Sequence, residues 1–102
     1  MSQITTKPFD PAAYLDNAEA VAAYITEALE TGDPAFVADA LGVIARSQGM
    51  TEVARKAGVS RESLYRSLST DGNPELATVM HVLRALGLQL SAVPASTRKD
   101  VA

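Results

Sequence analysis

The side chains best suited to chemistry gather in one short run in the second half of the chain. If this run is a helix, Leu64 and Leu68 fall on one face and point inward. The opposite face then presents two guanidiniums and a phenol, from Arg61, Arg66 and Tyr65. Guanidiniums suit phosphate oxygens and the acceptor edge of guanine in the major groove of DNA. The run therefore predicts a DNA-contacting helix, with groove contacts from Ser60, Arg61, Glu62, Ser63, Tyr65 and Arg66.

Two alternatives stay open on these residues alone. A pair of arginines by itself is more often part of a solvated surface helix that contacts nothing. Glu62 could accept a hydrogen bond from a cytosine amino group, or it could orient Arg66 through an i, i+4 pair. The residues that precede the helix favour DNA binding, because their arrangement is far more specific than two guanidiniums.

Those preceding residues predict a shorter helix and a tight turn. Thr51 can cap the shorter helix through its hydroxyl, and Gly58 stands where that helix must end, often with a positive φ. Ser60 can cap the helix that follows, and the small Ala54 permits close passage of the two. This layout over residues 50–69 is that of a helix-turn-helix, whose second helix lies in the major groove. The candidates for phosphate contacts, which set the register on DNA, are Arg46, Thr51, Arg55 and Lys56.

Three more helices should hold this pair in place. Apolar residues at helical spacing predict helices over residues 18–29, from Pro34 to about residue 48, and over 74–86. Gly42, inside the second of these, suggests that a neighbouring helix comes close. The expected buried stripes include Phe36, Leu76 and Met80, whereas Val82 lies off its stripe and could contact a second copy of the chain.

Composition limits the class of protein. The chain has 102 residues, enough for one domain with a modest core. Of these, 47% are hydrophobic, with many alanines, no tryptophan and few β-branched runs, so we expect an all-α fold. The absence of cysteine excludes disulfides and suits a reducing cytoplasm. No apolar run is long enough to cross a bilayer, and the first residues lack an apolar signal core. We therefore expect a cytoplasmic protein without membrane contact.

Residues for catalysis are scarce. His81 is the sole histidine, which leaves little from which to build a metal site or a nucleophile–base pair. The sequence has no phosphate-binding glycine loop and no nucleophile elbow. We predict a non-enzyme that holds no cofactor and no metal.

The net charge of −3 is unevenly distributed along the chain. Residues 1–43 carry one lysine against seven carboxylates, a net charge of −6. Residues 44–70 carry five cations against two carboxylates, a net charge of +3, and the remainder is neutral. This asymmetry suggests one surface for DNA and another for a basic partner, although an acidic helix face is usually only solvated.

The two ends of the chain flank the expected domain. We divide the chain into an N-terminal extension over residues 1–15, a helix-turn-helix domain over 16–93 and a polar tail over 94–102. The extension holds Phe9, Tyr14 and Leu15, which either fold back onto the domain or are covered by another protein. Residues 88–93 alternate between apolar and polar side chains, which suits either a strand paired with a second subunit or an extended segment laid on the helices.

Several runs of the chain resemble the addiction-module antidote family, the HigA-like antitoxins of bacterial type II toxin–antitoxin pairs. The most specific is Ser60-Arg61-Glu62-Ser63-Leu64-Tyr65-Arg66-Ser67-Leu68-Ser69, followed by Gly72-Asn73-Pro74, and further matches lie in residues 9–15, 44–50 and 85–88. The resemblance covers residues 9 to about 90. It implies repression of a shared operon and a small basic toxin partner of the RelE/ParE type, which cleaves messenger RNA or otherwise blocks growth.

With this resemblance, we expect a five-helix, phage-repressor-like domain that dimerises on operator DNA and neutralises a toxin. The acidic N-terminal half would complement a basic toxin, and the expected toxin contacts are Phe9, Tyr14, Leu15 and Tyr24. A first alternative is a stand-alone repressor derived from a prophage, without a toxin. A second is a protein-interaction domain that keeps the helical layout without binding DNA.

Overall fold

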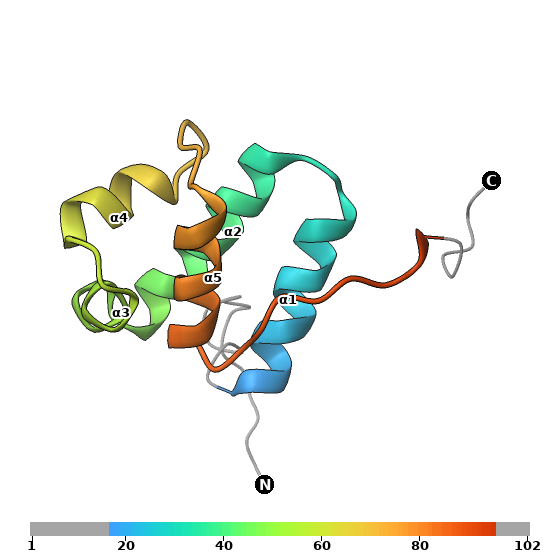
Figure 1. Cartoon of the computed structure of the whole chain (residues 1–102), viewed down its shortest axis with the longest axis horizontal. Helices are drawn as coiled ribbons and strands as arrows, with labels where there is room; N and C mark the ends of the chain where they lie inside the picture. The colour runs from blue at the N-terminus through green and yellow to red at the C-terminus, as the bar shows by residue number, and fades with distance from the viewer. Residues whose placement is uncertain (1–16, 96–102) are drawn as a thin grey trace, which may run out of the picture.

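The computed structural model describes residues 17–95 (Figure 1). These residues form five helices and no strand, so the all-α prediction is confirmed. None of these helices is both long and apolar enough to span a membrane. In chain order the helices are α1 (Ala18–Glu30), α2 (Pro34–Gln48), α3 (Met50–Ala57), α4 (Arg61–Ser67) and α5 (Leu76–Ala85).

The first two helices begin at side-chain caps. The side-chain oxygen of Asn17 accepts a hydrogen bond from the Ala20 N–H at 2.7 Å. The carboxylate of Asp33 accepts from the Ala35 N–H at 3.0 Å, directly before Pro34 at the first position of α2. Each cap satisfies one backbone donor that has no partner inside its helix, a contribution of roughly 1 kcal/mol.

The start of α3 differs from the prediction. Thr51 does not cap it, because the chain turns one residue before Met50, at Gly49, whose φ of +103° suits glycine. This early turn brings Met50 into the core, where 5% of its surface is exposed, and leaves Thr51 in the first turn on the outside. Thr51 remains available to an external partner as a result.

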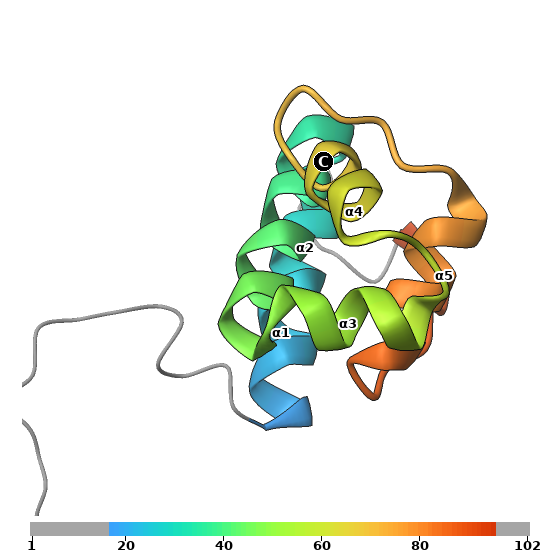
Figure 2. The same cartoon turned by 90° about the vertical axis from the view of Figure 1, so that its left-hand side faces the viewer.

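The core lies between α3, α5, α2 and α1. Helix α3 packs against α5, α4 and α2, while α1 packs on α2, so α3 and α4 stand on one side of the domain and α1 on the other (Figures 1 and 2). The largest fully buried side chains come from α1, α2, α4 and α5 and from the residue that follows α4. They are Val21, Leu41, Ile44, Leu64, Leu68 and Val82. One continuous apolar cluster thus fixes the position of α4 relative to the rest.

Helix α5 is rotated relative to the predicted stripe. Val82 is fully buried, so the predicted contact of this residue with a second copy is wrong. Leu76 and Met80 were expected inside but are 64% and 47% exposed, and Phe36 of α2 is 50% exposed. The helix presents Val82 and Leu83 to the core, because its packing against α3 selects that face over the neighbouring apolar one.

Gly42 confirms the prediction of a close approach. A β-carbon added there would lie 2.3 Å from the carbonyl oxygen of Leu68, at the end of α4. Because that atom belongs to the backbone, it could give way only if α4 moved away from α2. Glycine in the middle of α2 costs about 1 kcal/mol in helix propensity, and it allows α4 to sit close to the domain.

Residues 88–93 form no strand within this chain; they follow α5 as an extended segment beside α1 (Figure 1). The Leu88 N–H donates to the Leu83 carbonyl at 2.8 Å and so ties the start of the segment to α5. The alternation of side chains had allowed this arrangement as well as a strand. Pairing with a second subunit stays a prediction.

Candidate nucleic-acid interface

Gly58 makes the corner between α3 and α4, as predicted. Its φ of +77° lies in the left-handed region, and its N–H donates to the Arg55 carbonyl at 3.2 Å. The next N–H, of Val59, donates to the Ala54 carbonyl at 3.1 Å and completes the end of α3. The Ser60 hydroxyl then accepts from the Ser63 N–H at 3.0 Å and begins α4. The corner therefore needs only residues 58–60.

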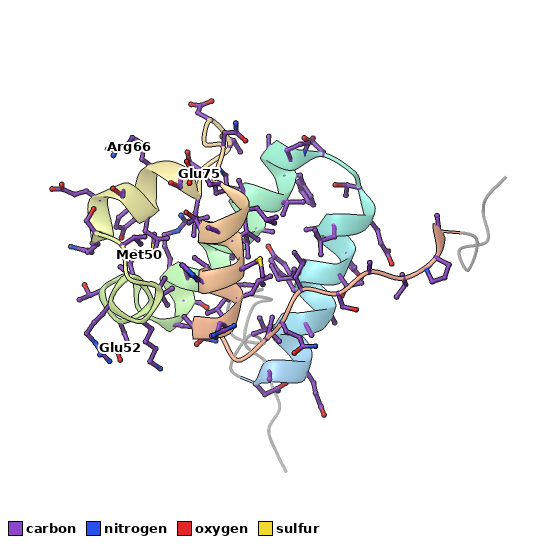
Figure 3. The ribbon with its side chains drawn as sticks, viewed as in Figure 1. Met50, Glu52, Arg66 and Glu75 are labelled. Carbon is purple, nitrogen blue, oxygen red and sulfur yellow. The ribbon has the colours of Figure 1, made fainter. Side chains whose placement is uncertain are left out.

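The two faces of α4 have opposite roles. Leu64 and Leu68 are fully buried and anchor the helix to the core. The other face is exposed to solvent and carries Arg61, Glu62, Tyr65 and Arg66, with Ser63 half-buried beside it. Figure 3 shows the Arg66 side chain directed away from the domain, whereas Met50, beside α3 and α4, is buried. The structure thus brings together the residues that the sequence predicted for groove contacts.

Arg61 and Tyr65 form a pair on this exposed face. The guanidinium carbon of Arg61 lies 5.4 Å from the centre of the Tyr65 ring, within the range of a cation–π contact. The contact limits the freedom of the Arg61 side chain, so less entropy is lost when its planar donors meet a ligand. The i, i+4 spacing of these residues could have predicted the pair. No ion pair joins Glu62 to Arg66, so the structure does not show Glu62 orienting that arginine.

The predicted phosphate-contacting residues are all exposed, and one of them has a competing partner. Arg55 forms an ion pair with Glu52 on the outer face of α3, with its Nε 3.3 Å from one carboxylate oxygen. These hydrogen bonds lower the pKa of the Glu52 carboxyl and raise the pKa of the Arg55 guanidinium. Sequence reasoning missed this pair, although its i, i+3 spacing is typical of helical ion pairs.

The other phosphate candidates lie on α3 and at the end of α2. Lys56 and Thr51 are exposed on α3. Arg46 is exposed at the end of α2, and its guanidinium lies beside Gly42, 3.1 Å from where a β-carbon on that glycine would be. It therefore lies close to the end of α4, which is a suitable position for a DNA backbone that follows the helix.

Glu52→Gln tests whether Arg55 contacts phosphate. The amide keeps the shape of the side chain but removes the charge that holds Arg55. If Arg55 binds phosphate, affinity for the DNA upstream of the gene should rise about two- to fivefold at low salt. Glu19→Gln on α1 removes the same charge far from α4 and is the control in a fluorescence-anisotropy titration. An equal rise in both variants would reflect net charge alone, and no rise would count against competition between Glu52 and phosphate for Arg55.

The predicted toxin contacts are mostly untested by the structure. Phe9, Tyr14 and Leu15 lie outside the described residues. Tyr24, on α1, is half-buried and packs against the core cluster. Within residues 17–95 no group of three or more histidine, aspartate or glutamate side chains could hold a metal ion.

Comparisons with known proteins agree with the resemblance to the addiction-module antidote family noted in the sequence. Residues 5–94 match the family described as a probable addiction module antidote protein. An uncharacterized protein of Haemophilus influenzae is 47% identical over 83 residues, which cover 81% of this chain and 86% of the relative. No solved structure matches the chain. Because the family match spans nearly the whole sequence, the chain belongs to the family of probable addiction module antidote proteins.

Proposed function

We propose that this protein is an antitoxin that neutralises a small basic toxin of the RelE/ParE type and represses its own operon by binding operator DNA. One observation carries the DNA-binding part: α4 is held by two fully buried leucines and turns two guanidiniums and a phenol outward. Membership of an antidote family supports the antitoxin part. The proposal gives the protein no catalytic role.

In this proposal α3 and α4 act as a helix-turn-helix within a phage-repressor-like, HigA-like domain. Helix α4 enters the major groove, where Arg61 and Arg66 reach base edges or phosphates and Tyr65 adds an apolar surface. Arg46, Thr51, Arg55 and Lys56 contact the phosphates on either side and set the register. The net charge of the whole chain is −3, but residues 44–70 carry +3, so the local field favours DNA.

A homodimer would place two copies of α4 on a palindromic operator. The half-sites would then lie about one helical turn, roughly 34 Å, apart. The exposed Leu76 and Met80 of α5 offer an apolar surface for the dimer that does not overlap the exposed face of α4. Pairing of the extended segment 88–93 between two subunits is the alternative.

The proposal is tested by titrating the protein against its own upstream DNA over a salt series. The three phosphate-directed cations, Arg46, Arg55 and Lys56, predict that log K falls against log salt with a slope of about −3 per protomer or steeper. A scrambled duplex of equal length is the control for specificity. Equal affinity for both duplexes would refute operator recognition.

Co-expression with the adjacent reading frame tests the antitoxin part separately. If the proposal is correct, the product of that frame arrests growth alone and co-purifies with this chain. Operator binding with no such partner would indicate a stand-alone repressor instead. Partner binding without operator binding would indicate a protein-interaction domain.

A further inference from the structure

We propose that the groove between α1 and residues 88–95 binds an apolar segment flanked by lysine or arginine from a second protein. This inference rests on the function proposed above, under which that protein is the toxin, and it names the surface that the toxin contacts. The sequence left that surface undetermined. The inference is carried by the shape of the groove, its exposed apolar side chains and its charge.

The groove has a volume of about 490 Å³ and lies at one side of the domain. Helix α1 supplies one wall and the extended segment supplies the other; their lining side chains include Ala22, Ile25, Thr26, Leu29, Leu90 and Val93. Leu29 is 44% exposed and Val93 is 73% exposed. Large apolar side chains gathered along a groove are typical of a protein-binding surface.

The edge of the groove is acidic. Glu30 lines it, and Glu19 falls on the same side of α1, because eleven residues correspond to about three helical turns. Residues 17–45 carry five carboxylates and no cation. A segment that fills the apolar floor would therefore gain most if lysine or arginine side chains flanked it.

The wall formed by residues 89–93 offers backbone groups as well. Within the described part of the chain, the backbone of these residues makes no hydrogen bond, and the segment runs extended (Figure 1). An extended occupant could pair with this backbone while its side chains enter the groove, which is a common mode of peptide binding.

Charge favours a different protein over this chain's own segments. A second copy would bring its own acidic edge to the groove, and its residues 88–95 carry no charge to compensate. Residues 1–16 hold Lys7 against Asp10 and Asp16, so this segment is itself net acidic. Residues 96–102 carry Arg98 and Lys99 against Asp100, but Val101 is their only large apolar side chain, which is too little to fill the apolar floor. No segment of this chain therefore matches both the charge and the apolar floor of the groove.

The groove also lies away from the DNA-directed face. Helix α1 and the extended segment are on the opposite side of the domain from α4 (Figures 1 and 2). One molecule could therefore hold DNA and the second protein together. Substitutions in the groove should for the same reason leave operator binding intact, which provides an internal control.

The test compares Leu29→Ser with Phe36→Ser in the full chain. Both remove a large apolar side chain that is about half exposed, but Phe36 does not line the groove. The probe is the purified product of the adjacent reading frame, measured by calorimetry. We expect Leu29→Ser to weaken binding about tenfold or more and Phe36→Ser to change it less than about threefold. Operator binding should be unchanged in both.

A charge pair of variants gives a second measurement. Glu19→Gln should weaken binding about threefold at low salt, whereas Glu27→Gln, which removes the same charge from another face of α1, should have a smaller effect. The inference is overturned if the groove variants bind the probe as the wild type does. It is also overturned if Leu29→Ser dissociates a dimer but keeps the probe, which assigns the groove to a second copy.

Two further outcomes separate this inference from the proposed function. If the wild-type chain does not bind the probe, the antitoxin proposal fails and the groove inference fails with it. If deletion of residues 1–16 or of residues 96–102 lowers thermal stability, and its effect is not additive with that of Leu29→Ser, the groove holds the deleted segment of this chain. Only the groove inference then fails.

Discussion

Replacing Arg61 and Arg66 together by alanine is expected to weaken operator binding by about a hundredfold or more. Each guanidinium that meets a guanine edge contributes roughly 1–3 kcal/mol of discrimination, so each single variant should lose about tenfold. The fold should not change, because both side chains are exposed and the helix is held by Leu64 and Leu68 on its other face. Fluorescence anisotropy with the upstream duplex measures the loss.

The salt dependence of the single variants separates two kinds of contact. An arginine that binds phosphate reduces the salt slope by about one when it is removed, whereas one that reads a base relaxes the preference for the operator over a scrambled duplex. Arg84→Ala is the matched control, because it removes an exposed arginine from α5. If both single variants bind like the wild type while Arg84→Ala weakens binding, α4 is not the helix in the groove.

Leu64→Ala is expected to lower the free energy of unfolding by about 2–5 kcal/mol, the usual range for a fully buried leucine. The melting temperature should fall by at least about 10 °C in a domain of this size. The side chain fills the contact between α4 and the core, so its loss leaves a cavity under α4. Operator affinity should fall as well, since α4 would no longer be held in one orientation.

Leu76→Ala is the control for Leu64→Ala, because it is the same substitution at a position that is 64% exposed. It should change stability by no more than about 0.5 kcal/mol in the monomer. Thermal melts followed by circular dichroism distinguish the two. A large effect of Leu76→Ala that grows with protein concentration would show that α5 is covered in a dimer. Equal small effects would mean that Leu64 is not the anchor of α4.

The arrangement of charges gives a physical reason for a protein with two partners. Cations are concentrated on α3, α4 and the end of α2, and carboxylates dominate α1 and the rest of α2. Because these surfaces face opposite sides of the domain, an acidic partner site would not repel DNA strongly at physiological salt, where fields decay within about 8 Å.

Local sequence determined much of this protein. Asn17, Asp33 and Ser60 fixed the starts of three helices, since each side chain satisfies backbone donors within three residues. Gly58 fixed the corner before α4, because few other residues adopt a positive φ there. The spacing of Leu64 and Leu68 decided which face of α4 is buried and hence which residues are exposed on the other face. Such features depend on neighbours along the chain, so the sequence by itself could predict them.

Tertiary packing decided the rest. The face of α5 that is buried depends on how α3 meets it, and so Val82 is inside while Leu76 and Met80 are outside. The groove joins α1 to residues 88–95, which are about sixty residues apart in sequence, so no local pattern could reveal it. Helical periodicity identifies the apolar faces of a helix. Where a helix has two apolar faces, only its contacts with elements distant in sequence determine which face is buried.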